Sequence, residues 1–151
     1  MNLKLLLIAF VFAFCSCKKT LTTSEQASAD EKIITKYISD NKLSATATGS
    51  GLYYIITTQG TGVNPTLSSN VTVNYKGYLT DGSVFDQSAA AGATFGLSQV
   101  IKGWQEGIPY FKKGGKGKLL IPSALGYGTT QQGSIPANSV LIFDIELLNV
   151  Q

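Results

Sequence analysis

The chain has 151 residues, 44% of them hydrophobic and 14% charged, and a formal net charge of +3 at neutral pH. This length suits one globular domain with a sizeable core and leaves no room for a second full domain. The net charge is too small to indicate nucleic-acid binding. The sequence contains no histidine, the usual general base of serine and cysteine hydrolases and the commonest metal ligand. Hydrolytic triads and histidine metal sites are therefore disfavoured.

The first seventeen residues, MNLKLLLIAFVFAFCSC, have the composition of a secretory leader. A lysine precedes an apolar run that is too short for a comfortable transmembrane helix. The segment FCSC resembles the processing box of bacterial lipoproteins, in which a diacylated cysteine becomes the new N-terminus. We expect residues 1–16 to be a lipoprotein signal peptide and Cys17 to be lipidated. The alternative is an ordinary signal peptide or anchor that is cut elsewhere.

Lipidation of Cys17 would hold the protein on a membrane of the bacterial cell envelope, since each buried methylene contributes about 0.8 kcal/mol. No acidic residue follows Cys17 directly, which favours the outer membrane, facing the periplasm. Both cysteines of the chain, Cys15 and Cys17, lie in this leader region. No disulfide is therefore expected within the folded domain.

The residues that follow predict a tether and then a helix. Residues 17–29 are expected to be the lipidated cysteine and a flexible tether, since the segment is polar and has no hydrophobic period. Residues 30–49 are expected to form an amphipathic helix and a linker, because Ile34, Tyr37 and Ile38 have helical spacing. We expect this helix to pack on the main domain, residues 50–151. A surface for partner binding or dimerisation is the alternative.

Four segments of the main domain have the β-branched and aromatic composition of strands. They are residues 52–58, 71–79, 116–122 and 140–150. In the last segment Leu141, Phe143, Ile145 and Leu147 share one face, opposite acidic residues. Residues 98–111 are the only segment within the domain suited to cover this face as a helix. The sequence therefore predicts an α+β fold, an antiparallel sheet packed on one short helix.

Apolar side chains also gather near the predicted turns of this domain. Tyr127 and Ile135 lie in a glycine-rich loop, residues 126–139, which is poorly suited to deep burial. Loops on a rigid scaffold often carry binding residues, although each such side chain taken singly is also explained by core packing. The sequence GKGK at 115–118 lacks the spacing of a phosphate-binding loop. An apolar binding cavity without metal or cofactor is therefore expected.

Three stretches of the domain resemble peptidyl-prolyl isomerases of the FK506-binding-protein (FKBP) type. They are VTVNYKGYLTDGSVFDQS, FGLSQVIKGWQEGIPYFKKGGKGKLLIPSALGYG and IPANSVLIFDIELLNV. The resemblance runs from about Gly51 to Val150. It implies an antiparallel half-barrel sheet of five to six strands wrapped around one short helix, here preceded by the short N-terminal helix. It also implies isomerisation of X-Pro bonds, with proline-containing polypeptides as partners and macrolides of the FK506 type as further ligands.

The same resemblance implies roles for individual residues. The expected catalytic residues are Asp86, Tyr127, whose hydroxyl would bind a substrate carbonyl, and Ile101, which offers its backbone N–H. The expected substrate-binding residues form the walls and floor of a proline cavity. They are Tyr75, Phe85, Phe95, Val100, Trp104, Ile135 and Phe143.

Amide rotation breaks resonance worth about 18–20 kcal/mol but transfers no proton, so a chain without histidine is not handicapped for it. Asp86 is therefore not expected to act as an acid or base. The resemblance implies instead that Asp86 lies at the edge of the cavity, where it accepts a hydrogen bond from Tyr75 and biases the field at the substrate carbonyl. A turn-capping aspartate is the alternative. For the whole protein, the alternatives to an isomerase of exported proteins are a non-catalytic peptide-binding chaperone and a structural envelope lipoprotein.

Overall fold

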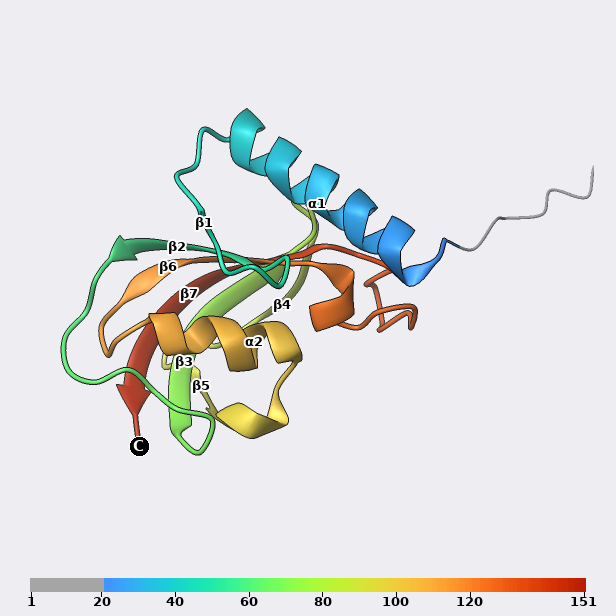
Figure 1. Cartoon of the computed structure of the whole chain (residues 1–151). Coiled ribbons are helices and arrows are strands. Elements are labelled where there is room, and N and C mark those ends of the chain that lie inside the picture. Colours follow the sequence, from blue (N-terminus) through green and yellow to red (C-terminus); the bar gives the residue numbers. More distant parts are fainter. Residues whose placement is uncertain (1–20) are drawn as a thin grey trace, which may run out of the picture.

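The structure is a computed structural model that describes residues 21–151. Its centre is an antiparallel sheet with the strand order β1-β2-β6-β7-β3-β4, in which β5 also pairs with β3 (Figure 1). The strands are β1 (Thr46–Ala47), β2 (Tyr53–Thr58), β3 (Asn70–Tyr78), β4 (Val84–Gln87), β5 (Ala93–Gly96), β6 (Lys116–Ile121) and β7 (Leu141–Val150). The helices are α1 (Thr23–Asp40) and α2 (Lys102–Gly107), with short 3-10 turns η1 (Leu97–Gln99), η2 (Ile108–Tyr110) and η3 (Ser123–Leu125).

The expected α+β architecture is confirmed, and the four predicted strands correspond to β2, β3, β6 and β7. The predicted apolar face of β7 is buried, with Leu141, Phe143, Ile145 and Leu147 each no more than 4% exposed. The sheet has seven strands where five to six were expected. The three strands beyond the four segments predicted from composition, β1, β4 and β5, have only two to four residues and are too short to show a period in the sequence.

Strand β3 carries two short partners in succession along one edge. Its residues 76–78 pair with β4, and its residues 70–73 pair with β5. Its other edge pairs with β7 along nearly the whole strand. Residues from β4 and β5 are thereby brought next to the middle of β3, where Tyr75 lies.

Helix α2 is shorter than residues 98–111, the expected span. Val100 and Ile101 are extended and precede it, and Pro109, which lacks an N–H, lies in the 3-10 turn that follows. Two glycines let α2 lie close against β6. A Cβ on Gly103 would be 2.4 Å from a carbon of Ile121, and one on Gly107 would be 2.6 Å from a carbon of Leu119.

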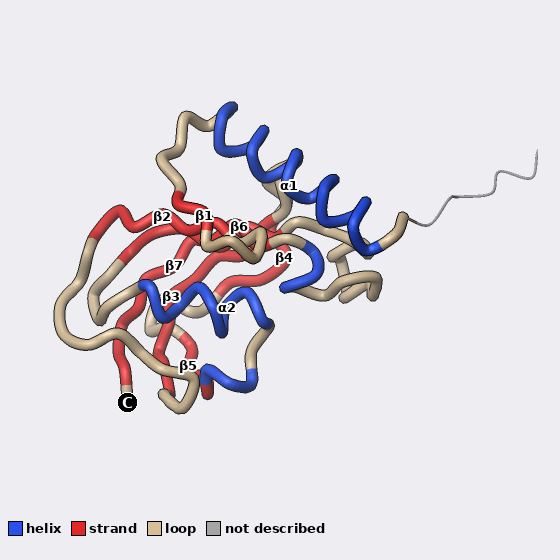
Figure 2. The backbone as a smooth tube through the Cα atoms, viewed as in Figure 1, coloured by secondary structure: helices blue, strands red, loops and turns tan. Residues whose placement is uncertain are grey.

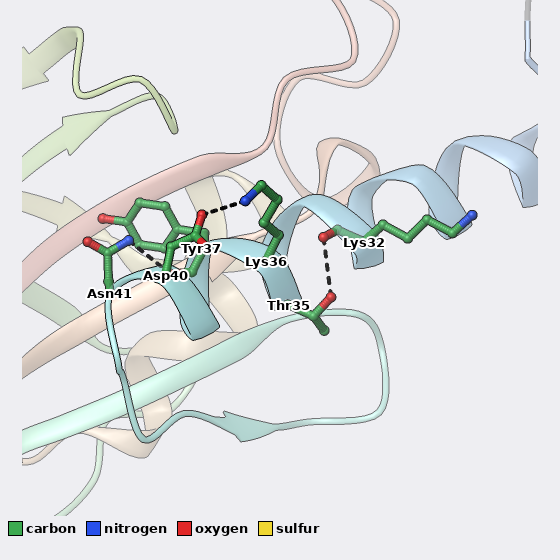
Figure 3. A network of polar contacts seen from close by, with 6 residues as sticks. All are labelled: Lys32, Thr35, Lys36, Tyr37, Asp40 and Asn41. Carbon is green, nitrogen blue, oxygen red and sulfur yellow. Dashed lines mark hydrogen bonds and ion pairs between the residues drawn. The ribbon is translucent and has the colours of Figure 1, made fainter.

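Helix α1 begins at Thr23, so the prediction of a flexible tether through residue 29 was wrong for its last part. The cause is a capping box, in which Thr22 accepts from the Glu25 N–H and the Glu25 carboxylate accepts from the Thr22 N–H at 2.8 Å. At the other end, Asn41 Nδ2 donates to the Tyr37 carbonyl, and Lys36 pairs with Asp40 on the exposed surface (Figure 3).

The expected packing of α1 on the main domain is confirmed. Figure 2 shows α1 along the side of the sheet away from α2. Ile34 is fully buried against Leu120 and Val140, with Tyr37 and Ile38 at the margin of this cluster. The face of the sheet opposite α2 is therefore partly covered by α1.

The expected signal peptide, the lipidation expected at Cys17 and the first part of the expected tether, through residue 20, lie outside the described residues. Between residues 21 and 151, neither helix is long and apolar enough to span a lipid bilayer.

Candidate active site

A cavity of about 360 Å³ opens between the sheet, the start of α2 and the loop after η3. Strands β3, β4, β5 and β7 supply its sheet side, and α2 supplies its floor. The lining residues are Tyr75, Phe85, Asp86, Phe95, Gln99, Val100, Ile101, Trp104, Tyr127 and Phe143. Nine of the ten residues predicted for the site therefore line one cavity, and the exception is Ile135.

Trp104 of α2 forms the floor and is only 4% exposed. Three rings meet it nearly at right angles: Tyr75 at 5.1 Å between ring centroids, Phe95 at 5.7 Å and Phe143 at 5.3 Å. Such edge-to-face contacts are favourable for aromatic pairs and fix ring orientation. The indole Nε1 is buried without a hydrogen-bond partner among the described residues.

The wall beside Trp104 depends on a glycine in β3. Phe85 of β4 packs edge-on against Phe143 of β7, with ring centroids 5.5 Å apart. Both rings lie over Gly77, where a Cβ would come within 2.5 Å of Phe85 and 2.8 Å of Phe143. The absence of a side chain at this position is what allows the two rings to lie against the sheet.

A carboxylate lies at the rim of this apolar cavity. The Tyr75 hydroxyl donates to Asp86 Oδ2 at 2.7 Å, as expected from the sequence. Burial, and next the bond to Asp86, raise the pKa of Tyr75 to about 12, so the tyrosine remains a neutral donor. Asp86 itself is exposed in β4, so its charge is solvated when the cavity is empty.

The alternative role of Asp86 as the turn cap is not what the structure shows. Asp81 caps the turn between β3 and β4, because its Oδ1 accepts from the Ser83 N–H at 2.9 Å and from the Ser83 hydroxyl at 2.6 Å. These bonds lower the pKa of Asp81. Asp86 is therefore free of the turn and is held at the cavity by Tyr75.

Two hydrogen-bond donors of the cavity have no acceptor within residues 21–151. One is the Tyr127 hydroxyl, on a side chain that is 37% exposed, and the other is the backbone N–H of Ile101. Burial, together with the negative charge of Asp86, raises the pKa of Tyr127. Both groups are neutral donors near neutral pH and are available to a carbonyl.

Comparison with known proteins agrees with this geometry. Residues 62–148, more than half of the chain, match the model of the family described as FKBP-type peptidyl-prolyl cis-trans isomerase. The chain belongs to this family. The FKBP-type isomerase FkpA of Buchnera aphidicola subsp. Schizaphis graminum is 50% identical over 123 residues, which are 80% of this chain and 48% of that protein. FkpA of Escherichia coli K12 is 50% identical over 103 residues, 67% of this chain and 38% of that protein.

Two solved structures of similar proteins have the same fold. The crystal structure of FkpA from Escherichia coli gives a TM-score of 0.74 at 41% identity, covering 85% of this chain and 62% of that one. A peptidyl-prolyl cis-trans isomerase from Pseudomonas syringae gives a TM-score of 0.75 at 30% identity, covering 88% of this chain and 98% of that one. The chain spans less than half the length of the two curated relatives above.

One expected wall residue of the FKBP cavity lies elsewhere. Ile135 is only 5% exposed and belongs to the core, so the expectation that its glycine-rich loop keeps it out of the core was wrong. It borders a separate hollow of about 250 Å³ that shares Phe85, Asp86 and Tyr127 with the main cavity. An antiparallel bridge between Gln132 and Ile135 folds the loop back and turns the isoleucine inward.

The FKBP cavity also contains Gln99, which was not among the predicted site residues, although it directly precedes Val100 and Ile101. Asp86 is the single charged residue of the lining. In the described part of the chain, no group of three acidic or cysteine side chains is placed to hold a metal ion. The arrangement offers apolar surface, neutral donors and one carboxylate, which are means to bind and polarise an amide.

Proposed function

We propose that this protein catalyses cis–trans isomerisation of X-Pro peptide bonds and so assists the folding of exported proteins. The observation that carries the proposal is the cavity itself, an aromatic hollow floored by Trp104 with Asp86 at its rim. Its volume of about 360 Å³ can take a proline ring and the adjoining amide. Uncatalysed, such bonds isomerise over roughly tens to hundreds of seconds.

Desolvation is the first source of catalysis. The planar amide is more polar than the twisted amide, because resonance separates charge. Transfer from water into the ring-lined cavity therefore disfavours the ground state relative to the twisted transition state. A reduction of the barrier by about 6 kcal/mol gives a rate factor on the order of 10⁴. Binding and desolvation can lower the barrier to rotation by this amount without a covalent step.

Hydrogen bonds are the second source. The Tyr127 hydroxyl and the Ile101 N–H have no acceptor among residues 21–151, and both residues line the cavity. We assign them to the carbonyls that flank the bound proline. A donor positioned for the carbonyl of the twisted amide stabilises the transition state more than the planar substrate.

Asp86 acts in this proposal through its charge and not through a proton. The hydrogen bond from Tyr75 fixes the carboxylate at the rim, where its field acts on the substrate carbonyl carbon as the amide rotates. When a peptide covers the cavity and excludes water, this field strengthens because the local dielectric constant falls.

A protease-coupled assay on proline tetrapeptides tests the proposal. The folded protein should accelerate the cis-to-trans phase, and a macrolide of the FK506 type should compete for the cavity. Turnover equal to the uncatalysed rate, from a protein that binds the same peptide tightly, would instead support a non-catalytic peptide-binding chaperone. Tight binding together with fast turnover would exclude that alternative.

We also propose that the protein works in the bacterial cell envelope, held by a lipid on Cys17 after removal of residues 1–16, and that residues 50–151 are the isomerase domain. The chain between Cys17 and Thr23 can span at most about 20 Å, so the domain would lie close to the membrane surface. Radioactive palmitate should label the wild type but not Cys17→Ser, and the variant should leave the membrane fraction. Equal labelling or equal membrane retention of the variant would exclude lipidation at Cys17.

A further inference from the structure

The position of the Tyr127 ring depends on the backbone around it. Its hydroxyl has no hydrogen-bond partner within the described residues, and its side chain is 37% exposed. The residues on either side are glycines, and both of their amides donate to one carbonyl: Gly126 N to Ser123 O at 3.0 Å and Gly128 N to Ser123 O at 2.8 Å. Ser123 therefore fixes the peptide units on both sides of Tyr127.

Ser123 is in turn held by a residue from α1. Asp30 Oδ2 accepts from the Ser123 N–H at 2.8 Å and from the Ser123 hydroxyl at 2.6 Å, across 93 positions of sequence. Both residues are only 1% exposed. The other carboxylate oxygen accepts from Gln26 Nε2 at 2.7 Å. Because a buried carboxylate is stable only when its acceptors are used, these bonds tightly restrict where Ser123 can lie.

The segment next to Tyr127 is also bonded to the other end of the glycine-rich loop, residues 126–139. The Asn138 N–H donates to the Gly128 carbonyl at 2.7 Å, so the two ends of the glycine-rich segment are joined next to Tyr127. Gly128 has φ +58, in the left-handed region. A displacement of Ser123 would therefore move the whole segment that carries the tyrosine and not only one turn.

We propose that Asp30 is a positioning residue for catalysis, which places the Tyr127 hydroxyl by holding Ser123. This inference rests on the proposed function, since it assigns a task to the donor of that mechanism. It also gives α1 a role beyond covering the sheet. The Asp30–Ser123 bonds are the link through which α1 contributes to the geometry of the catalytic loop.

The main variant is Asp30→Asn, which keeps the shape of the side chain but removes its charge. The milder variant Ser123→Ala removes the hydroxyl donor and keeps the backbone bond. We expect kcat/KM for a proline tetrapeptide to fall roughly threefold to tenfold in Asp30→Asn and less in Ser123→Ala. The decrease should lie mainly in kcat, because the apolar walls that bind proline do not move.

The matched control is Ile34→Ala, which weakens the packing of α1 one turn further along but touches neither Ser123 nor the loop. It should lower the melting temperature at least as much as Asp30→Asn and leave kcat/KM of the folded protein unchanged. All assays are done well below the melting temperature of each variant. If Ile34→Ala and Asp30→Asn reduce kcat/KM equally, the effect of Asp30 is only on stability and the inference is wrong.

A double-mutant cycle with Tyr127→Phe tests whether Asp30 acts through the tyrosine. In the Tyr127→Phe background, Asp30→Asn should change kcat/KM by less than about twofold, because the hydroxyl that it positions is gone. An equal decrease in both backgrounds would overturn the inference, as would full activity of Asp30→Asn.

Amide hydrogen exchange gives a measurement that needs no activity. The amides of Gly126 and Gly128 should exchange faster in Asp30→Asn and in Ser123→Ala than in Ile34→Ala. Unchanged exchange at both glycines would overturn the inference even in an active enzyme. A wild type without turnover would overturn the proposed function instead, and the exchange rates would still show whether Asp30 holds the loop.

Discussion

The Tyr75 hydroxyl and Asp86 Oδ2 lie 2.7 Å apart and join the middle of β3 to β4 at the rim of the aromatic cavity. The donor belongs to a ring that also packs edge-on against Trp104, so the carboxylate is positioned by the same side chain that contributes to the cavity wall. Because Asp81 already caps the turn between these strands, Asp86 has no structural task there.

Because Asp86 lies at the cavity and Asp81 caps the turn, we expect a substitution of Asp86 to lower activity and a substitution of Asp81 to lower stability. Asp86→Leu should lower kcat/KM by about tenfold to a hundredfold, the equivalent of a lost hydrogen bond to a charged group, with little change in stability because Asp86 is exposed. Asp81→Ala should lower stability, because the turn loses both bonds from Ser83, with unchanged kcat/KM. Denaturant unfolding and the protease-coupled assay measure both. The reverse pattern would return Asp86 to the role of a turn cap.

Alkaline pH should destabilise the protein through Tyr75. The folded state raises its pKa to about 12, above the ordinary value of 10.0, so folding favours the neutral phenol. The stabilisation is complete below about pH 10, where the unfolded chain is also protonated, and is lost as the pH rises toward about 12. Tyr37 and Tyr78 have pKa values raised to about 12 as well.

Tyr75→Phe should therefore reduce the slope of stability against pH in this range without abolishing it. Thermal melts at several pH values give the slope directly, and Tyr110→Phe, at an exposed tyrosine outside the cavity lining, serves as the comparison. An unchanged slope in Tyr75→Phe would mean that its phenol is not held neutral by the fold.

Near neutral pH, by contrast, kcat/KM should be flat. The cavity contains no histidine, and the pKa values of its tyrosines Tyr75 and Tyr127 are raised. Neither tyrosine is therefore expected to titrate between about pH 6 and 9. A bell-shaped profile in this interval, measured with a peptide that does not itself titrate, would contradict a mechanism without proton transfer.

Much of this site could be predicted because the chain places it in contiguous motifs. Phe85 and Asp86 are adjacent, and Val100, Ile101 and Trp104 lie within one short segment. The long strands were predictable for the same reason, since periodicity is a local property. The position of Ile135 was not, because it depends on the backbone bridge to Gln132, which no composition rule reveals.

The least predictable contact was that between Asp30 and Ser123. In the sequence, Asp30 looks like one more acid at the start of an amphipathic helix, and Ser123 like a loop residue. Their burial against each other follows only from the docking of α1, which brings together residues 93 positions apart. The start of α1 at Thr23, by contrast, could have been predicted from the sequence, because Thr22 and Glu25 have the spacing of a capping box. The polar composition of this segment favoured a tether instead.

A single methyl group on β3 should distort the cavity wall. Gly77→Ala would place a Cβ within 2.5 Å of Phe85 and 2.8 Å of Phe143, and both rings would have to move. Overpacking of this kind typically costs about 1–3 kcal/mol. We expect lower stability and a raised KM, measured by unfolding and by the peptide assay. Gly96→Ala is the control for glycine loss in a strand, because an added Cβ there would come no closer than 3.3 Å to a side chain. A normal KM in Gly77→Ala would show that the wall is more pliable than the structure implies.

Replacement of Trp104 should separate the role of its volume from that of its indole N–H. Trp104→Ala empties a buried aromatic position at a typical cost of about 3–5 kcal/mol, and should raise KM strongly because the proline ring loses its floor. Trp104→Phe keeps a ring against Tyr75, Phe95 and Phe143. It also removes a buried N–H without a partner in the described chain, whose burial costs the wild type about 1–3 kcal/mol.

We therefore expect Trp104→Phe to lose less than half the stability that Trp104→Ala loses and to retain measurable turnover. Circular dichroism is the suitable probe of unfolding, because each variant lacks the only tryptophan of the chain. If Trp104→Phe is as unstable as Trp104→Ala, the indole N–H makes a stabilising bond in solution. If both variants keep the wild-type KM, the proline ring does not rest on this residue.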